Sequence, residues 1–257
     1  MHTIRELLEN LRPEHKFSSV LPPELVCFVD KLSERGLTVE VPDYWDGDYF
    51  MSRFIEKWKH TQEECVPEQM EYPESIFNQV GVALKLICAW DLLTLGLSKK
   101  KCIPIELIFE STNDLECSAF LSGESFSKQS LQMLRNYCES CVAIMYFQKK
   151  KDSFQAWLRD ISHYHFPDYR DMVENLTEES VLLTWENRFL HNIYTQLNSS
   201  VHNQRHRINM AFPRMEQYLK SNGLEDIEEW SRELKNILLF MLRLYLRLHE
   251  NKYWNEL

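Results

Sequence analysis

The spacing of apolar residues between Leu131 and Met145 constrains the fold more than any other feature of this chain. Leu131, Leu134, Cys138, Cys141 and Met145 follow one another at i, i+3, i+7, i+10 and i+14. This spacing places the five side chains on one face of an α-helix, where they can form a buried stripe. The sequence therefore predicts a core helix in this segment.

Few residues that break helices interrupt the rest of the chain. The 257 residues include only 6 Gly and 9 Pro, whereas all-β folds need many tight turns. The 14 Phe, 11 Tyr and 7 Trp suit thick packing between helices. We expect an all-α protein in which a compact multi-helix bundle (residues 71–257) carries a less regular helical N-terminal appendage (residues 1–70).

Apolar periodicity and helix-breaking residues predict where the other helices lie. Residues 37–41 alternate too briefly to predict a strand. Gly223 is expected to end one helix, and the last helix is expected at Glu225–Tyr253. The remaining expected helices are Ile4–Leu11, Glu24–Glu34, a segment through Phe50, Phe54 and Trp58, Glu74–Leu95, Ile103–Leu121, Phe154–Ile161, Tyr169–Leu176, and one from Glu179 into the Asn198–His202 region.

The cysteines and the apolar segments favour a cytoplasmic protein that makes no membrane contact. Seven cysteines lie mostly in apolar runs and lack the regular spacing of a disulfide framework. Arg5 and Glu6 interrupt the first apolar stretch, so no secretory signal is expected. The apolar segment Asn236–Leu248 is too short to span a bilayer and contains Arg243 and Arg247, so we interpret it as a core helix.

Basic residues concentrate in one segment of an otherwise acidic chain. The formal net charge is −10, yet five Lys or Arg accompany a single acid, Glu216, between Asn187 and Lys220. Segregated basic residues allow an acidic protein to bind nucleic acid. The alternative is a solvated face that pairs with the acidic stretch Glu225–Glu233. The candidate RNA-binding residues in this basic segment are Arg188, Arg205, His206, Arg207 and Arg214.

Arg159 and His165 enclose a short motif with recognisable chemistry. The segment reads Arg-Asp-Ile-Ser-His-Tyr-His, an arginine and a polar residue followed by four residues and a histidine. This pattern resembles the motif of HEPN ribonucleases, which are all-helical proteins of prokaryotic toxin and phage-defence systems. The resemblance implies metal-independent RNA cleavage, in which histidine exchanges protons and arginine stabilises the scissile phosphate, usually between two protomers. The alternative is a polar helix end before Pro167.

A second resemblance covers roughly Ser125–Arg207. The residues of "YTQLNSSVH", from Tyr194 to His202, match the pattern Y-x-x-L-[N/S]-x-x-V-H of helical HEPN-like proteins. The earlier segments "SLQMLRNYCESCVAIMYF" and "DSFQAWL" are similar to the Leu-Arg…Glu helix and the aromatic-x-x-Trp-Leu segment of those proteins. The resemblance implies that His202 is the active-site histidine and that Asn198 lies one turn before it.

This second pattern departs from the ribonuclease form. No arginine directly precedes Asn198, so Arg205 or Arg188 would have to substitute for it in space. The alternative is structural: Tyr194, Leu197 and Val201 pack at i, i+3 and i+7, and His202 caps the helix.

Cys138-x-x-Cys141 and His202-x-x-x-His206 each have the spacing of zinc ligands. Both cysteines lie on the apolar stripe, however, and about 60 residues separate the two pairs, which favours two core cysteines. The chain contains no Gly-rich phosphate-binding loop, no G-x-S-x-G and no His-Glu-x-x-His. We therefore expect no metal and no cofactor.

Two functions remain open. In the first, the chain is an HEPN-like protein of a defence or toxin-type system that binds RNA, and His202 or the pair Arg159 and His165 carries any cleavage. In the second, it is a non-catalytic interaction module or accessory subunit that docks on a larger complex, as the acidic balance and the incomplete motif favour. The expected partners are RNA, and either a second copy of the chain or another protein.

Overall fold

The computed structural model of the chain describes residues 2–10, 23–34, 38–39, 47, 49–56, 74–98, 105–123, 126–159, 165–202 and 215–250. Helices account for most of these residues, which confirms the all-α prediction. Two strands of two residues each, β1 (His2–Thr3) and β2 (Thr38–Val39), pair antiparallel, with His2 opposite Val39.

Most of the helices lie within a few residues of the expected positions. Residues 49–56 are helical, as the aromatic pattern predicts. The other helices are α1 (Ile4–Asn10), α2 (Pro23–Glu34), α4 (Glu74–Ser98), α5 (Ile105–Gly123), α6 (Ser127–Lys149), α7 (Lys151–Arg159), α8 (Tyr169–Glu178), α9 (Thr184–His202) and α11 (Met215–Glu250).

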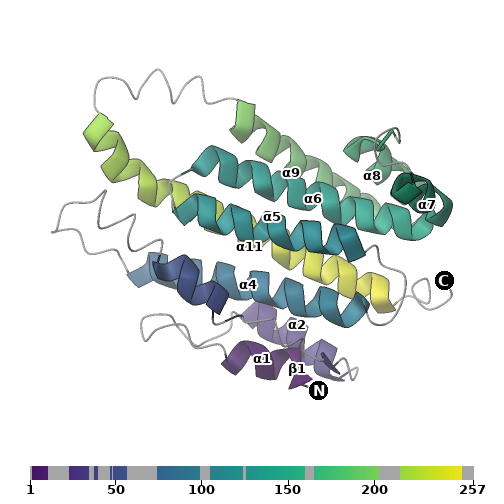
Figure 1. Ribbon diagram of the computed structural model, residues 1–257, viewed down its shortest axis with the longest axis horizontal. Coiled ribbons are helices and arrows are strands. Elements are labelled where there is room, and N and C mark those ends of the chain that lie inside the picture. The colour runs from purple at the N-terminus through teal and green to yellow at the C-terminus, as the bar shows by residue number, and fades with distance from the viewer. Residues whose placement is uncertain are drawn as a thin grey trace.

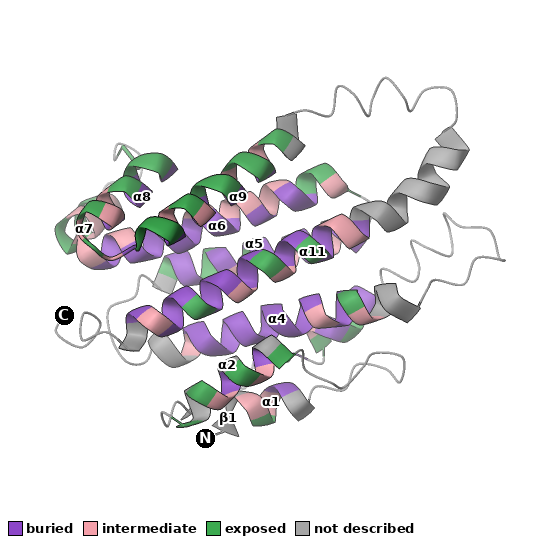
Figure 2. Cartoon of the chain, turned by 180° about the vertical axis from the view of Figure 1, so that it is seen from behind, coloured by how far each residue is buried: buried purple, intermediate pink, exposed green. Residues whose placement is uncertain are grey.

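The long helices α4, α5, α6, α9 and α11 form a bundle with their axes roughly aligned (Figure 1). Helix α6 packs against α5, α8, α9 and α11, whereas α4 packs against α11, α5 and α1. The short helices α7 and α8 lie together at one end of the bundle, and α1 and α2 lie beyond α4 (Figure 1). Figure 2 shows buried residues concentrated on α4, α6 and α11, and exposed residues along the outward sides of α8 and α9.

The predicted stripe on α6 is buried at all five positions. Burial extends around more of this helix than one stripe, because α6 has neighbours on several sides. The Asn78–Leu95 window of α4 is long and apolar enough to cross a membrane by composition alone. In the fold, however, 78% of that window is buried, as in a helix at the centre of a core.

The late apolar segment of α11 is also a core helix, as its sequence indicates. Ile237, Met241 and Tyr245 are each about 1% exposed. The Tyr245 hydroxyl donates a hydrogen bond to the Cys141 carbonyl at 2.9 Å, which fixes α11 against the middle of α6.

Small serines bring α5 and α6 close together. Ser118 Oγ donates to the Ser130 carbonyl at 2.9 Å, and Ser130 Oγ donates back to the Ser118 carbonyl at 3.0 Å. Hydroxyl-to-backbone bonds in both directions require a short distance between the two helix axes, which only small residues permit. Trp230 of α11 then donates its indole N–H to Ser118 Oγ at 2.8 Å. Three helices therefore meet at one fully buried polar point.

Two expected helix boundaries are wrong. The helix expected from Glu179 begins at Thr184, because Ser180 adopts a left-handed conformation with φ of 59°. The Val181 N–H donates to the Leu176 carbonyl at 2.8 Å and the Ser180 N–H to the Thr177 carbonyl at 3.0 Å, the two bonds of a Schellman motif that ends α8. This motif ordinarily takes Gly at the position of Ser180, so the sequence carries no obvious sign of it.

The second correction concerns Gly223, which lies inside α11 and does not end a helix. A single interior Gly costs only about 1 kcal/mol relative to Ala, which the packing of a long helix can outweigh. The division of the chain at residue 70 stays a prediction. Leu8, Leu25 and Met51, which precede that boundary, belong to the same hydrophobic core as α4 and α11.

Substituting Ser118 with Ala should lower the free energy of unfolding by about 1–3 kcal/mol, because the buried Trp230 indole N–H would lose its acceptor. Urea denaturation followed by circular dichroism measures this loss. The matched control is Ser52→Ala at an exposed helical position, where we expect a change within about 0.5 kcal/mol. Equal stability of the two variants would contradict the role given to Ser118.

Candidate functional site

The predicted site residues occupy two ends of the bundle. Arg159 is the last residue of α7 and His165 lies in the segment before α8; both are exposed. Arg188 is exposed on α9, Asn198 is half-buried near the end of that helix, and His202 is its last residue. Four predicted residues lie outside the described part of the chain: Arg205, His206, Arg207 and Arg214.

The fold does not bring the two candidate histidine motifs together within one chain. Asn187 Nδ2 donates to Thr177 Oγ1 at 3.0 Å and so fixes the start of α9 against α8. Asn198 lies eleven residues further along α9, about 16 Å away at the rise of an α-helix. In Figure 1, α7 and α8 lie at one end of α9 and the C-terminal end of α9 lies at the other. Any site formed by Arg159 and His165 is therefore separate from one formed by Asn198 and His202.

A polar cluster joins the two segments that carry the second resemblance. Arg135 of α6 donates to Glu139 Oε1 at 3.1 Å through Nε and to the Tyr194 hydroxyl at 2.8 Å through Nη2. The Tyr194 hydroxyl in turn donates to Glu139 Oε1 at 2.7 Å. Each of the three groups therefore contacts both of the others. We call Arg135, Glu139 and Tyr194 the α6–α9 cluster.

Aromatic contacts hold Tyr194 in this position. Its ring stacks on that of Tyr169, with centroids 4.1 Å apart and planes 8° apart. The Tyr169 hydroxyl donates to the Leu190 carbonyl at 3.2 Å, which anchors the stack to α9. Burial, followed by the hydrogen bond to the Glu139 carboxylate, raises the pKa of Tyr194. The phenol therefore stays protonated at neutral pH and acts as a donor.

Asn198 extends this inner face of α9 by one turn beyond Tyr194. Its Oδ1 is buried and accepts no hydrogen bond from the residues that the structure describes. A buried amide oxygen without a donor costs about 1–3 kcal/mol, so a group that supplied an N–H or O–H would be held there favourably. The hydrogen bonds of Arg135 in the α6–α9 cluster go to Glu139 and Tyr194 and not to Asn198.

The outer face of α9 carries no exposed carboxylate. Glu186 is the only acidic residue from Thr184 to His202. It is 1% exposed and receives two hydrogen bonds from Arg247 of α11, Nε to Oε1 at 2.8 Å and Nη2 to Oε2 at 2.6 Å. The Leu183 N–H also donates to Glu186 at 2.8 Å, which caps the start of α9. The single negative charge of this helix is therefore buried and neutralised.

A groove of about 700 Å³ runs between α9 and α11 beside that ion pair. Phe189 of α9 stacks on Phe240 of α11 with centroids 4.1 Å apart. Trp185 stands at the edge of the groove with 58% of its surface exposed. This is the largest exposed aromatic surface on α9 among the residues that the structure describes.

The cysteine pair lies in the core. Cys138 and Cys141 are fully buried, and burial raises the pKa of both thiols well above its ordinary value. Zinc binds thiolates, so this environment opposes metal binding. His206 is outside the described residues, and the described ones hold no group of three or more His, Cys, Asp or Glu side chains arranged for a metal ion.

Sequence reasoning missed the long-range partners. Arg247 lies 61 residues after Glu186, and nothing in the local pattern connects the two. The capping role of Glu186 was missed as well, because the sequence predicted a helix from Glu179 and because Leu183, at the capping position, is not the Ser or Thr of a capping box. Comparison of the chain with protein-family models, with curated proteins and with solved structures finds no match.

The stability of the protein should fall as pH rises through neutrality because of Asp114 on α5. Burial, and then the charges of Glu110 and Glu139, raise the pKa of Asp114 to about 7. The unfolded value is about 3.9, so this stabilising contribution is complete below about pH 4 and is lost as pH rises through about 7. Asp114→Asn should remove this part of the pH dependence.

Urea denaturation at about pH 5 and about pH 8 tests the expectation. The control is Asp152→Asn at an exposed position on α7, which should keep the wild-type pH profile. An unchanged profile in the Asp114→Asn variant would show that this carboxyl does not titrate as described.

Replacing Arg247 with Ala should lower the free energy of unfolding by about 3 kcal/mol, because it leaves the buried Glu186 carboxylate without a counter-charge. Chemical denaturation measures the loss. Arg243→Ala, one turn earlier and exposed, is the control, with an expected change within about 0.5 kcal/mol. Equal losses in both variants would contradict the importance of the ion pair.

Proposed function

We propose that this chain is an HEPN-like protein of a defence or toxin-type system. It binds RNA along the exposed face of α9 and through the arginines of the basic segment that follow this helix. One observation carries the proposal. The exposed face of α9 bears no carboxylate in a chain whose net charge is −10, because the only acid of the helix is buried against Arg247.

The exposed side chains of this face suit a polyanion. Arg188 supplies a fixed positive charge, and His191 can add another when protonated. Asn192, Gln196 and Ser199 supply neutral donors and acceptors between them. Phosphate contacts from arginine, with amides and hydroxyls alongside, are the ordinary means by which proteins hold RNA. Beyond His202, the sequence adds Arg205, Arg207 and Arg214 in the same direction along the chain.

The proposal assigns any cleavage to His202, with Asn198 as its neighbour one turn earlier. His202 ends the helix that carries the RNA-binding face, so an RNA strand that bound both this face and the arginines after it would pass His202. Imidazole can accept the proton of a ribose 2′-hydroxyl near neutral pH, and no metal is required for that step. Arg159 and His165, at the opposite end of α9, are the competing pair.

Arg188→Ala and Arg205→Ala should each weaken the binding of a fluorescent single-stranded RNA and lower the salt dependence of binding by about one phosphate contact. Fluorescence anisotropy over a salt series measures both quantities. The matched control is Arg170→Ala, an exposed arginine on α8 that is not part of the α9 face, which should leave binding unchanged. Equal affinity of all four proteins would remove the support for this face.

The cleavage assignment is tested in the same RNA with EDTA present. His202→Ala should abolish cleavage and retain most of the binding, whereas His165→Ala should leave cleavage intact. The reverse result would move the site to Arg159 and His165. Absence of cleavage by the wild-type protein, with RNA binding retained, would leave an RNA-binding protein without activity.

A second function is favoured by the groove between α9 and α11. Trp185, Phe189 and Phe240 give this groove an aromatic lining of the kind that accepts an apolar helix of a protein partner. In this alternative the chain is a non-catalytic interaction module or accessory subunit. Failure of the wild-type protein to bind RNA, together with monomeric behaviour in light scattering, would favour it.

A further inference from the structure

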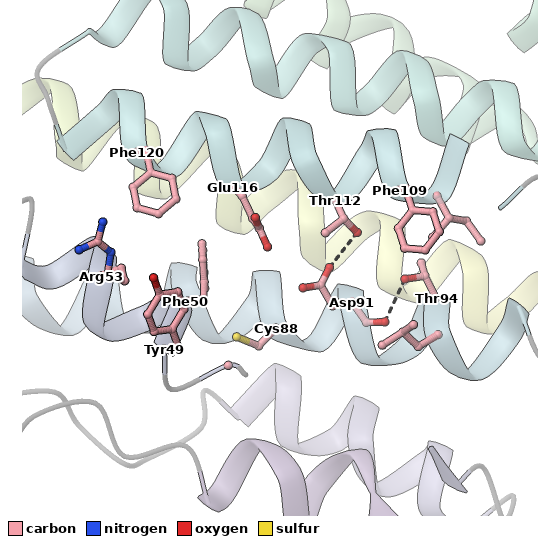
Figure 3. Close-up of a pocket in the computed structure, with 13 residues that line it drawn as sticks. Tyr49, Phe50, Arg53, Cys88, Asp91, Thr94, Phe109, Thr112, Glu116 and Phe120 are labelled. Atoms are coloured by element: carbon pink, nitrogen blue, oxygen red, sulfur yellow. Dashed lines mark hydrogen bonds between the residues drawn. The ribbon is translucent and has the colours of Figure 1, made fainter. Parts of the chain in front are cut away.

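A cavity of about 450 Å³ lies between α4, α5, Gly47 and residues 49–56, on different helices from the RNA-binding face proposed for α9 (Figure 3). Its volume is within the range of small-molecule sites in proteins. The aromatic residues that line it are Tyr49, Phe50, Phe109 and Phe120.

The aromatic side chains come from two separate segments and meet around the cavity. Phe50 contacts Phe120 of α5 edge to face, with ring centroids 5.9 Å apart. Tyr49 and Phe109 are 63% and 52% exposed, so they stand where the cavity opens to solvent. Exposed aromatic rings that gather around one cavity, unlike apolar residues scattered singly over a surface, are typical of a ligand site.

Two carboxylates face the same space. Asp91 of α4 is 9% exposed and accepts a hydrogen bond from Thr112 Oγ1 at 2.8 Å. Glu116 of α5 is half-buried and makes no hydrogen bond or ion pair with any residue that the structure describes. Figure 3 shows Glu116 directed from α5 towards α4, into the gap that Phe50 and Cys88 border. Burial raises the pKa of Glu116, as is expected of a carboxylate withdrawn from water without a counter-charge.

The arginine of the cavity does not supply that counter-charge. Arg53 lies towards the exposed side of residues 49–56, and its Nη1 pairs with Glu56 at 3.5 Å. The cavity therefore combines aromatic walls, a carboxylate held by a threonine and a second carboxylate that pairs with no cation among the described residues. A neutral apolar ligand would leave Glu116 uncompensated, and an anion would be repelled by both acids.

The geometry points to a binding site for a small organic cation, an ammonium group carried on an apolar body. The ammonium pairs with the Glu116 carboxylate, and the apolar body fills the space between the phenyl rings. Aromatic faces attract cations in addition to excluding water from the pair. A bare metal ion fits less well, because the described residues hold no group of three or more His, Cys, Asp or Glu side chains arranged for a metal.

Titration calorimetry with three ligands that share one apolar body tests this inference on the full chain. The ligands are 3-phenylpropylamine, 3-phenylpropanol and 3-phenylpropionate, which differ in the charge of the head group. We expect the amine to bind at least about tenfold more tightly than the alcohol, as a charge-assisted hydrogen bond in a half-buried site would produce. The carboxylate should show no binding.

Two variants on α5 distinguish binding in the cavity from a general effect of removing one negative charge. Glu116→Gln should weaken amine binding by about tenfold or more and leave alcohol binding unchanged. Glu106→Gln, an exposed position on α5 away from the cavity, should bind the amine as the wild type does. Thermal melts verify folding, and Glu116→Gln should be at least as stable as the wild type because it removes an uncompensated buried charge.

Three results would each overturn the inference. These are equal affinity for amine and alcohol, unchanged amine binding in Glu116→Gln, and no heat of binding with any of the three ligands at millimolar concentration. None of them bears on RNA binding by α9, because the cavity residues lie on other helices.

Discussion

The reciprocal hydrogen bonds between Ser118 and Ser130 set the distance between α5 and α6. The positions of Trp230 on α11 and of residues 49–56 depend on that distance. With small side chains at the contact, the Trp230 indole of α11 can reach Ser118 and complete a buried polar point. Trp230 then stacks on Phe54, with centroids 6.1 Å apart, and so holds residues 49–56 against the bundle. Those residues close one side of the cavity through Tyr49 and Phe50. A larger residue at either serine would therefore disturb the helix pair and the cavity together.

The fold distributes its negative charge unevenly, and the two proposed sites depend on this distribution. On α9, the only acid is buried and paired with Arg247, which leaves an outer face without carboxylates. On α5, Asp114 and Glu116 are both withdrawn from water, and burial raises the pKa of each. The α9 face therefore suits an anion, whereas the cavity beside α5 suits a cation. The net charge of the whole chain predicts neither preference, because each depends on which acids are compensated locally.

Local patterns predicted most of the helices and failed where a boundary depends on other parts of the fold. The stripe from Leu131 to Met145 is buried because a 3.6-residue period fixes which side chains share a face. The boundary before α9 was missed because Ser180, not Gly, occupies the left-handed position. Gly223 was expected to end a helix, yet α11 continues to a segment whose Trp230 and Leu234 are buried in the core. The gain from burying such side chains exceeds the local cost of one Gly.

The sequence by itself determined that the chain is helical, which faces are apolar and where positive charge gathers, because these properties repeat over a few residues. It also identified Asn198 and His202 as candidate site residues on one helix, in a pattern that begins at Tyr194. Only the tertiary structure decided that Tyr194 meets Arg135 and Glu139, that Glu186 meets Arg247 and that Glu116 faces an aromatic cavity. Such contacts depend on how each helix is rotated and crossed against its neighbours. That arrangement is fixed by the shape of the whole core, which no local period encodes.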